Sequence, residues 1–127
     1  MLVADDDTDG IELLAEVLRL AGADVRLART APEALGLLDG TWSPDAMVLD
    51  IGLPKVDGYD LLRSIRAMPA LSEVPAVAVS AYAFENDKRQ ATAAGFQMHL
   101  DKPYDVEALI DIVAKLTDGK RSPPRPR

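Results

Sequence analysis

The sequence predicts an α/β fold built on a parallel β-sheet, and three observations support this prediction. Short apolar segments alternate with amphipathic segments five times over about 118 residues, which is the pattern of successive strand–helix units. Several apolar segments are nearly continuous, as expected for strands that are buried on both faces of a sheet. Polar side chains directly follow four of these segments. In a parallel sheet such side chains share one edge, because every crossover returns the chain in the same direction.

The first half of the chain contains three predicted strands and two predicted helices. Strands are expected at residues 2–4, 24–28 and 45–50. The first helix is indicated by apolar side chains that recur at spacings of three and four residues. These are Ile11, Leu14, Val17, Leu18 and Ala21. Thr30 and Glu33 have the spacing of a capping box, which predicts a second helix that continues to about residue 38.

The second half of the chain is predicted to contribute two further strands and three helices. The strands are expected at residues 76–79 and 96–100, and the helices at residues 59–68, 85–94 and 106–116. Three prolines follow, at Pro123, Pro124 and Pro126. Because proline neither continues a helix nor pairs within a sheet, residues 119–127 are expected to be an extended linker or chain end. The predicted organisation is one domain, residues 1–118, and a basic proline-rich tail, residues 119–127.

Composition and charge restrict the kind of protein further. The chain has 127 residues, 48% of them hydrophobic, which suits a single globular core, and it contains no cysteine for disulfides or thiolate chemistry. No apolar run approaches the roughly 20 residues of a membrane span and no secretion signal is evident, so we expect a cytoplasmic protein. The net charge is −7, although the tail carries Lys120, Arg121, Arg125 and Arg127. Such an acidic domain is not expected to bind nucleic acid directly.

Five polar side chains stand at the ends of the predicted strands. Asp5 and Asp6 follow the first strand, Asp50 ends the third, Ser80 follows the fourth, and Lys102 comes just after the fifth. Ligands of open parallel sheets bind beyond the carboxyl ends of the strands, so these side chains are expected to meet in one functional site.

The chemistry of this set points to a phosphoryl group and a divalent cation. Three neighbouring carboxylates repel one another unless a cation shares the site. Mg²⁺ is the expected cation, with Mn²⁺ as a substitute, because Mg²⁺ prefers oxygen ligands and is commonly held by one or two carboxylates plus a phosphate. A carboxylate can be the nucleophile that accepts a phosphoryl group. The hydroxyl of Ser80 and the ammonium of Lys102 would then stabilise the phosphoryl oxygens.

Four motifs together resemble those of the receiver domain of two-component response regulators. They are Asp5-Asp6, Asp50 followed by Ile-Gly-Leu-Pro, Ser80-Ala81-Tyr82, and Lys102-Pro103. The resemblance covers residues 2 to about 117. It implies a flavodoxin-like (CheY-like), doubly wound fold with a five-stranded parallel sheet in the order 2-1-3-4-5 and five helices. Residues 94–103 are more similar to the receivers of hybrid sensor histidine kinases than to those of DNA-binding regulators.

This resemblance also implies a phosphoacceptor and its metal ligands. Asp50 would receive a phosphoryl group from a phosphohistidine of a sensor histidine kinase or of a histidine phosphotransfer protein. Asp5, Asp6 and Asp50 would bind Mg²⁺, and the backbone carbonyl of Gly52 would complete the protein ligands. The domain would promote its own phosphorylation and slow autodephosphorylation, as a signalling switch rather than a turnover enzyme.

The resemblance further implies how phosphorylation would be transmitted. Ser80 and Lys102 would bind the phosphoryl group, and Ser80 would act with His99 as the switch pair. The switch aromatic of the family stands three residues before the lysine, where this chain has His99. The partner-binding face would lie near the fourth helix, the fifth strand and the fifth helix, and the resemblance allows for a phosphorylation-dependent homodimer.

Two other functions remain open at this stage. One is a receiver-like interaction module that is never phosphorylated, although core packing alone does not call for three acids and a lysine at one edge. The other is an aspartyl-phosphate hydrolase of the haloacid dehalogenase type, with its nucleophile at Asp5. That class is expected to carry a D-x-D-x-T/V pattern, which residues 5–9 do not complete.

Overall fold

The computed structural model describes residues 1–53, 56–80, 89, 92–102 and 105–121. In this part of the chain one sheet contains five strands: β1 (Leu2–Ala4), β2 (Arg26–Ala28), β3 (Met47–Asp50), β4 (Ala76–Ser80) and β5 (Met98–Asp101). Their order is β2-β1-β3-β4-β5, and every neighbouring pair is parallel. The predicted doubly wound sheet and its strand order are therefore confirmed.

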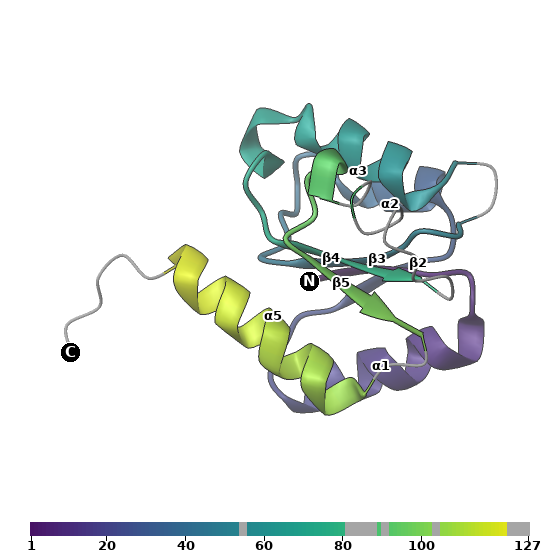
Figure 1. Ribbon diagram of the computed structural model, residues 1–127, viewed down its shortest axis with the longest axis vertical. Helices are drawn as coiled ribbons and strands as arrows, with labels where there is room; N and C mark the ends of the chain where they lie inside the picture. The colour runs from purple at the N-terminus through teal and green to yellow at the C-terminus, as the bar shows by residue number, and fades with distance from the viewer. Residues whose placement is uncertain (54–55, 81–88, 90–91, 103–104, 122–127) are drawn as a thin grey trace.

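Helices cover both faces of this sheet (Figure 1). One face carries α1 (Thr8–Leu20) and α5 (Val106–Arg121), and the other carries α2 (Ala31–Leu37), α3 (Gly58–Arg66) and the short 3₁₀ turn η1 (Pro69–Leu71). The three central strands, β1, β3 and β4, are buried throughout, so their alternate residues supply two separate cores. In β4, Ala76 and Ala78 belong to the core under α2 and α3, whereas Val77 and Val79 belong to the core under α1 and α5.

Side-chain caps fix where three of the helices begin. Asp7, Thr30 and Asp57 each accept a hydrogen bond from the backbone N–H three residues later, at the starts of α1, α2 and α3. The predicted capping box at α2 is present with one change. Glu33 Oε1 accepts from the backbone N–H of Arg29 at 3.2 Å, one residue earlier than in the usual box.

The structure extends the predicted last helix beyond residue 116. Helix α5 continues to Arg121, three residues into the segment that was expected to be non-helical. Proline stops a helix from continuing through its own position and disfavours helical backbone at the residue before it, and both positions, 122 and 123, come after Arg121. The division of the chain at residue 118 stays a prediction.

The predicted fourth helix, residues 85–94, lies largely outside the described residues. Its described positions, 89 and 92–94, are helical. Gly95 follows with a φ of +111°, the left-handed conformation that commonly ends a helix. Within the described part of the chain, none of the helices combines the length and apolar character needed to cross a membrane.

Candidate functional site

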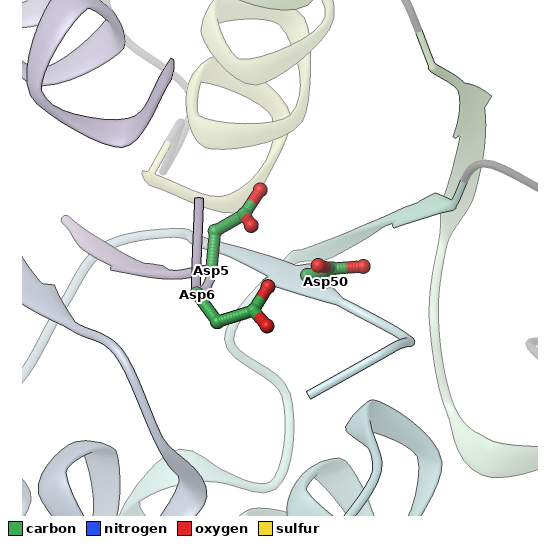
Figure 2. A group of neighbouring side chains, drawn as sticks. All are labelled: Asp5, Asp6 and Asp50. Carbon is green, nitrogen blue, oxygen red and sulfur yellow. The ribbon is translucent and has the colours of Figure 1, made fainter. Parts of the chain in front are cut away.

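The candidate site lies at the carboxyl-terminal edge of the sheet, where three carboxylates from two adjacent strands converge. Asp5 and Asp6 follow β1, and Asp50 is the last residue of β3 (Figure 2). One carboxylate oxygen from each of the three lies within 4.8 Å of the others. Asp5 and Asp50 are buried, whereas Asp6 is exposed. The three acids therefore lie close together, as we expected from their positions at the strand ends.

Lys102 supplies a positive charge to this cluster. Its Nζ lies 2.8 Å from Asp5 Oδ2 and 3.2 Å from Asp50 Oδ2. The backbone N–H of Lys102 donates to the carbonyl of Ser80 at 2.8 Å, so the end of β5 is attached to the end of β4. Burial alone would lower the pKa of Lys102, but the hydrogen bond to Asp5 and the charges of Asp50 and Asp5 outweigh it and raise the pKa. The ammonium form is therefore favoured.

The carboxylate of Asp50 is held between two donors. The backbone N–H of Gly52 donates to Oδ1 at 2.9 Å, and Lys102 contacts Oδ2. Burial raises the pKa of Asp50, and the neighbouring charge of Asp5 raises it further, whereas the Gly52 N–H and Lys102 oppose this change. The site thus holds a carboxylate whose charge is only partly compensated.

This cluster fits a divalent cation bound by oxygen atoms. Asp5, Asp6, Asp50 and Lys102 carry three formal negative charges and one positive charge, which leaves −2. Mg²⁺ prefers such carboxylate sites and keeps several waters, which suits a group that includes one exposed member. The carbonyl of Gly52 as a metal ligand stays a prediction.

Gly58, which the sequence analysis does not single out, allows the loop after β3 to return close to the end of that strand. The loop after β3 returns so closely that the Gly58 N–H donates to the carbonyl of Ile51 at 3.0 Å. A Cβ atom at Gly58 would lie 2.5 Å from the carbonyl oxygen of Asp50, closer than real Cβ contacts. At Gly52 a Cβ would lie 3.6 Å from Asp50 Oδ1, an ordinary contact.

The two proposed switch residues lie on neighbouring strands. Ser80 is buried at the end of β4 and pairs in register with Asp101 of β5, and His99 pairs with Ala78. The side chain of His99 is only 7% exposed, with Nδ1 3.4 Å from Asp101 Oδ1. Among the described residues neither ring nitrogen of His99 has a hydrogen-bond partner. The switch role remains a prediction, but the histidine is a buried side chain and not a surface one.

Comparison with known families identifies the domain. A family model for the response regulator receiver domain matches residues 1–114. The chain belongs to this family. One relative of the receiver, a 14.6 kDa protein from the sodA1 3′ region of Leptolyngbya boryana, is 41% identical and covers 89% of this chain and 86% of its own length. The transcriptional regulatory protein PrrA of Mycobacterium leprae is 37% identical over 91% of this chain. The receiver spans about half of PrrA, 47% of its length.

Solved receiver structures have the same fold. A two-component response regulator from Clostridium difficile superimposes with a TM-score of 0.87 at 26% identity, covering 95% of this chain and 97% of that one. The receiver domain of the sensor histidine kinase PA1611 from Pseudomonas aeruginosa has a TM-score of 0.82 at 28% identity, with 91% and 94% coverage. That structure has a magnesium ion coordinated in its active site cleft.

Proposed function

We propose that this receiver domain accepts a phosphoryl group on Asp50 from a phosphohistidine, as a step of a two-component phosphorelay. The observation that supports this most is the placement of Asp50. Its buried carboxylate ends β3, within contact of Lys102 and next to Asp5 and Asp6. A buried carboxylate with a partly uncompensated charge is a suitable nucleophile toward phosphorus.

In the proposed reaction an oxygen of the Asp50 carboxylate attacks the phosphorus atom. The phosphorus–nitrogen bond of the donor breaks, and its electron pair stays on the imidazole of the donor. The Gly52 N–H holds one carboxylate oxygen of Asp50 and thereby fixes the orientation of the group. Lys102, already shared between Asp5 and Asp50, would follow the added charge and donate to a phosphoryl oxygen. The hydroxyl of Ser80 would donate to another.

Asp5, Asp6 and Asp50 would hold Mg²⁺ in this site, together with the Gly52 carbonyl. When bound, the ion supplies positive charge beside the phosphoryl oxygens. Support comes from the three converging carboxylates and from the magnesium ion in the receiver of PA1611. Mn²⁺ is expected to substitute, because it favours the same oxygen ligands.

The phosphoryl donor is proposed to be a sensor histidine kinase or a histidine phosphotransfer protein. The receiver itself is proposed to be cytoplasmic. Movement of Ser80 toward the phosphoryl group would draw His99 with it and change the face near β5 and α5. Substituting Phe for His99 tests this part. Partner binding that is the same in His99→Phe and in the unaltered chain, with and without phosphorylation, would exclude the switch role.

Incubation with acetyl phosphate and Mg²⁺, followed by intact mass measurement, tests the phosphoacceptor proposal. We expect one labile phosphoryl adduct that is absent in Asp50→Asn and absent without the metal. An adduct that persists in Asp50→Asn but disappears in Asp5→Asn would instead favour the hydrolase reaction. If neither acetyl phosphate nor beryllofluoride with Mg²⁺ produces an adduct or chemical-shift changes, the chain is an interaction module without phosphorylation.

A further inference from the structure

Asp6 is the exposed member of the three carboxylates, and it lies in the short loop between β1 and α1. Its carboxylate extends toward Asp50 (Figure 2), and one of its oxygens lies within 4.8 Å of the nearest ligand oxygens of Asp5 and Asp50. In the part of the chain that the structure describes, this carboxylate has neither an ion-pair partner nor a hydrogen-bond donor. The position of Asp6 therefore depends on how firmly the backbone of the loop is held.

The residues at the end of β2 hold both ends of this loop. At the start of the loop, the backbone N–H of Asp5 donates to the carbonyl of Ala28, the last residue of β2, at 3.0 Å. At the end of the loop, Nε of Arg29 donates to the hydroxyl of Thr8, the first residue of α1, at 3.2 Å. Because Ala28 and Arg29 are consecutive, one short piece of chain is bonded to both sides of Asp6.

Two further hydrogen bonds fix the direction of the Arg29 side chain. The guanidinium also donates to Oε1 of Glu12, one turn further along α1, at 3.4 Å. The backbone N–H of Arg29 donates to Oε1 of Glu33, in the first turn of α2, at 3.2 Å. The planar fork of an arginine can contact Thr8 and Glu12 at the same time, whereas the single ammonium group of a lysine cannot reproduce this geometry. Arg29 is thus held by both helices and holds the start of α1 in turn.

We propose that Arg29 is a positioning residue for Mg²⁺ binding and that it acts through Thr8. This inference rests on the proposed magnesium site and adds a residue that does not touch the ion. The bond to Thr8 keeps the start of α1 against the end of β2, and so keeps the carboxylate of Asp6 beside those of Asp5 and Asp50. Hydrogen bonds that orient metal ligands contribute to metal affinity. The charge of Arg29 acts in the opposite direction, because a nearby cation repels Mg²⁺.

These opposite effects separate positioning from charge. Arg29→Met removes both the charge and the donors, so a pure charge effect would make Mg²⁺ bind more tightly. We expect instead that its dissociation constant rises by roughly threefold, as for the loss of one partly exposed hydrogen bond. Thr8→Val removes only the acceptor and should raise the constant at least as much, whereas Thr8→Ser keeps the hydroxyl and should bind like the unaltered chain. Arg26→Met is the charge control, because Arg26 lies on the same strand over the ring of Trp42, at 4.6 Å, and its loss should not raise the constant.

Two NMR measurements on the folded domain provide the test, and neither requires phosphorylation. Titration with MgCl₂, followed by the ¹H–¹⁵N shifts of residues 5–7, gives the dissociation constant. Backbone ¹⁵N relaxation without the metal gives the order parameter of the Asp6 amide, which should decrease in Thr8→Val and in Arg29→Met and stay unchanged in Thr8→Ser.

The results separate this inference from the magnesium site on which it rests. The role of Arg29 is overturned if Thr8→Val binds Mg²⁺ as tightly as the unaltered chain, or if Arg29→Met binds it more tightly. It is also overturned if the order parameter of Asp6 is the same in all variants. Shifts that do not respond to Mg²⁺ in the unaltered chain would overturn the magnesium site itself, and the positioning role with it.

Discussion

Asp50 is the residue at which stability and the proposed chemistry make opposite demands. Its carboxylate is buried beside that of Asp5, and a single lysine is shared between the two. Such a group is poorly compensated in the free domain, and therefore available to a phosphoryl group or a cation. The same burial means that ionising Asp50 works against the folded state.

The first prediction concerns the stability of Asp50→Asn without Mg²⁺. Because folding raises the pKa of Asp50, the folded state holds this proton at pH values where the unfolded state has lost it. Stability from this group is complete below the ordinary aspartate pKa of about 4 and decreases as pH rises through the folded-state pKa. Asparagine does not ionise. We expect the free energy of unfolding of Asp50→Asn to exceed that of the unaltered chain by on the order of 1 kcal/mol at pH 7. This difference should become smaller as the pH falls toward 4.

Urea denaturation of both proteins between pH 4 and pH 8 provides the measurement. A difference that is constant over this range would show that the change arises from packing and not from the titration of Asp50. An Asp50→Asn variant that is less stable at pH 7 would mean that Lys102 compensates the charge fully in the folded state.

The second prediction compares two glycines of the loop after β3. In Gly58→Ala the new methyl would lie 2.5 Å from the Asp50 carbonyl oxygen, so the loop must shift. We expect a loss of roughly 2–3 kcal/mol in stability and slower phosphorylation of the displaced Asp50. Gly52→Ala is the matched control, because its methyl makes an ordinary contact at 3.6 Å and should change stability by less than about 0.5 kcal/mol. Equal losses in the two variants would contradict the proposed close approach at Gly58.

At the scale of elements, the features that the sequence predicted well are those with local causes. The cap at Thr30 bonds to a backbone N–H three residues away, and the apolar spacing of α1 repeats within one turn. The site could also be predicted, since each strand delivers its polar residue at its own end and the parallel topology brings the ends together.

The features that were missed depend on residues far apart in the chain. Arg66, at the end of α3, donates to the carbonyls of Leu71 and Gly95, both at 2.9 Å, and to Oε1 of Gln97 at 3.3 Å. Gly95 and Gln97 are 29 and 31 residues away, and no local pattern marks such a partnership. The close approach of Gly58 to the end of β3 could not be predicted from the sequence for the same reason, because it depends on the path of a whole loop.

The third prediction tests this cluster around Arg66. Lysine keeps the charge but lacks the forked donors with which Arg66 contacts the carbonyls of Leu71 and Gly95 at the same time, so at least one of them loses its donor. We expect Arg66→Lys to lower the free energy of unfolding by about 1–2 kcal/mol in urea denaturation. Arg63→Lys is the control on the same helix, since the partner of Arg63 among the described residues is Asp60, at 2.8 Å on the exposed side. A loss of similar size in Arg63→Lys would indicate that α3 itself, and not the cluster, is sensitive to the change.

At the scale of the whole molecule, the charged side chains of the candidate site are separate from the two hydrophobic cores. The acids and Lys102 occupy the edge where the strands end, and hydrophobic side chains form the two cores beneath it in the described part of the chain. A cation bound at this edge would contact residues at the ends of β1 and β3, which are neighbours in the centre of the sheet. Binding there should consequently stabilise the entire cooperative unit and not a single loop.

The fourth prediction uses this linkage to test the metal site. A ligand that binds only the folded state at ten times its dissociation constant adds about 1.4 kcal/mol of stability, which for a domain of this size raises the melting temperature by roughly 5 °C. We expect Mg²⁺ to produce such a shift in thermal unfolding followed by circular dichroism, and K⁺ at equal ionic strength to produce none. Asp6→Asn is the decisive variant, because Asp6 is exposed and its loss leaves the Lys102 contacts in place. A shift of unchanged size in that variant would exclude Asp6 as a magnesium ligand.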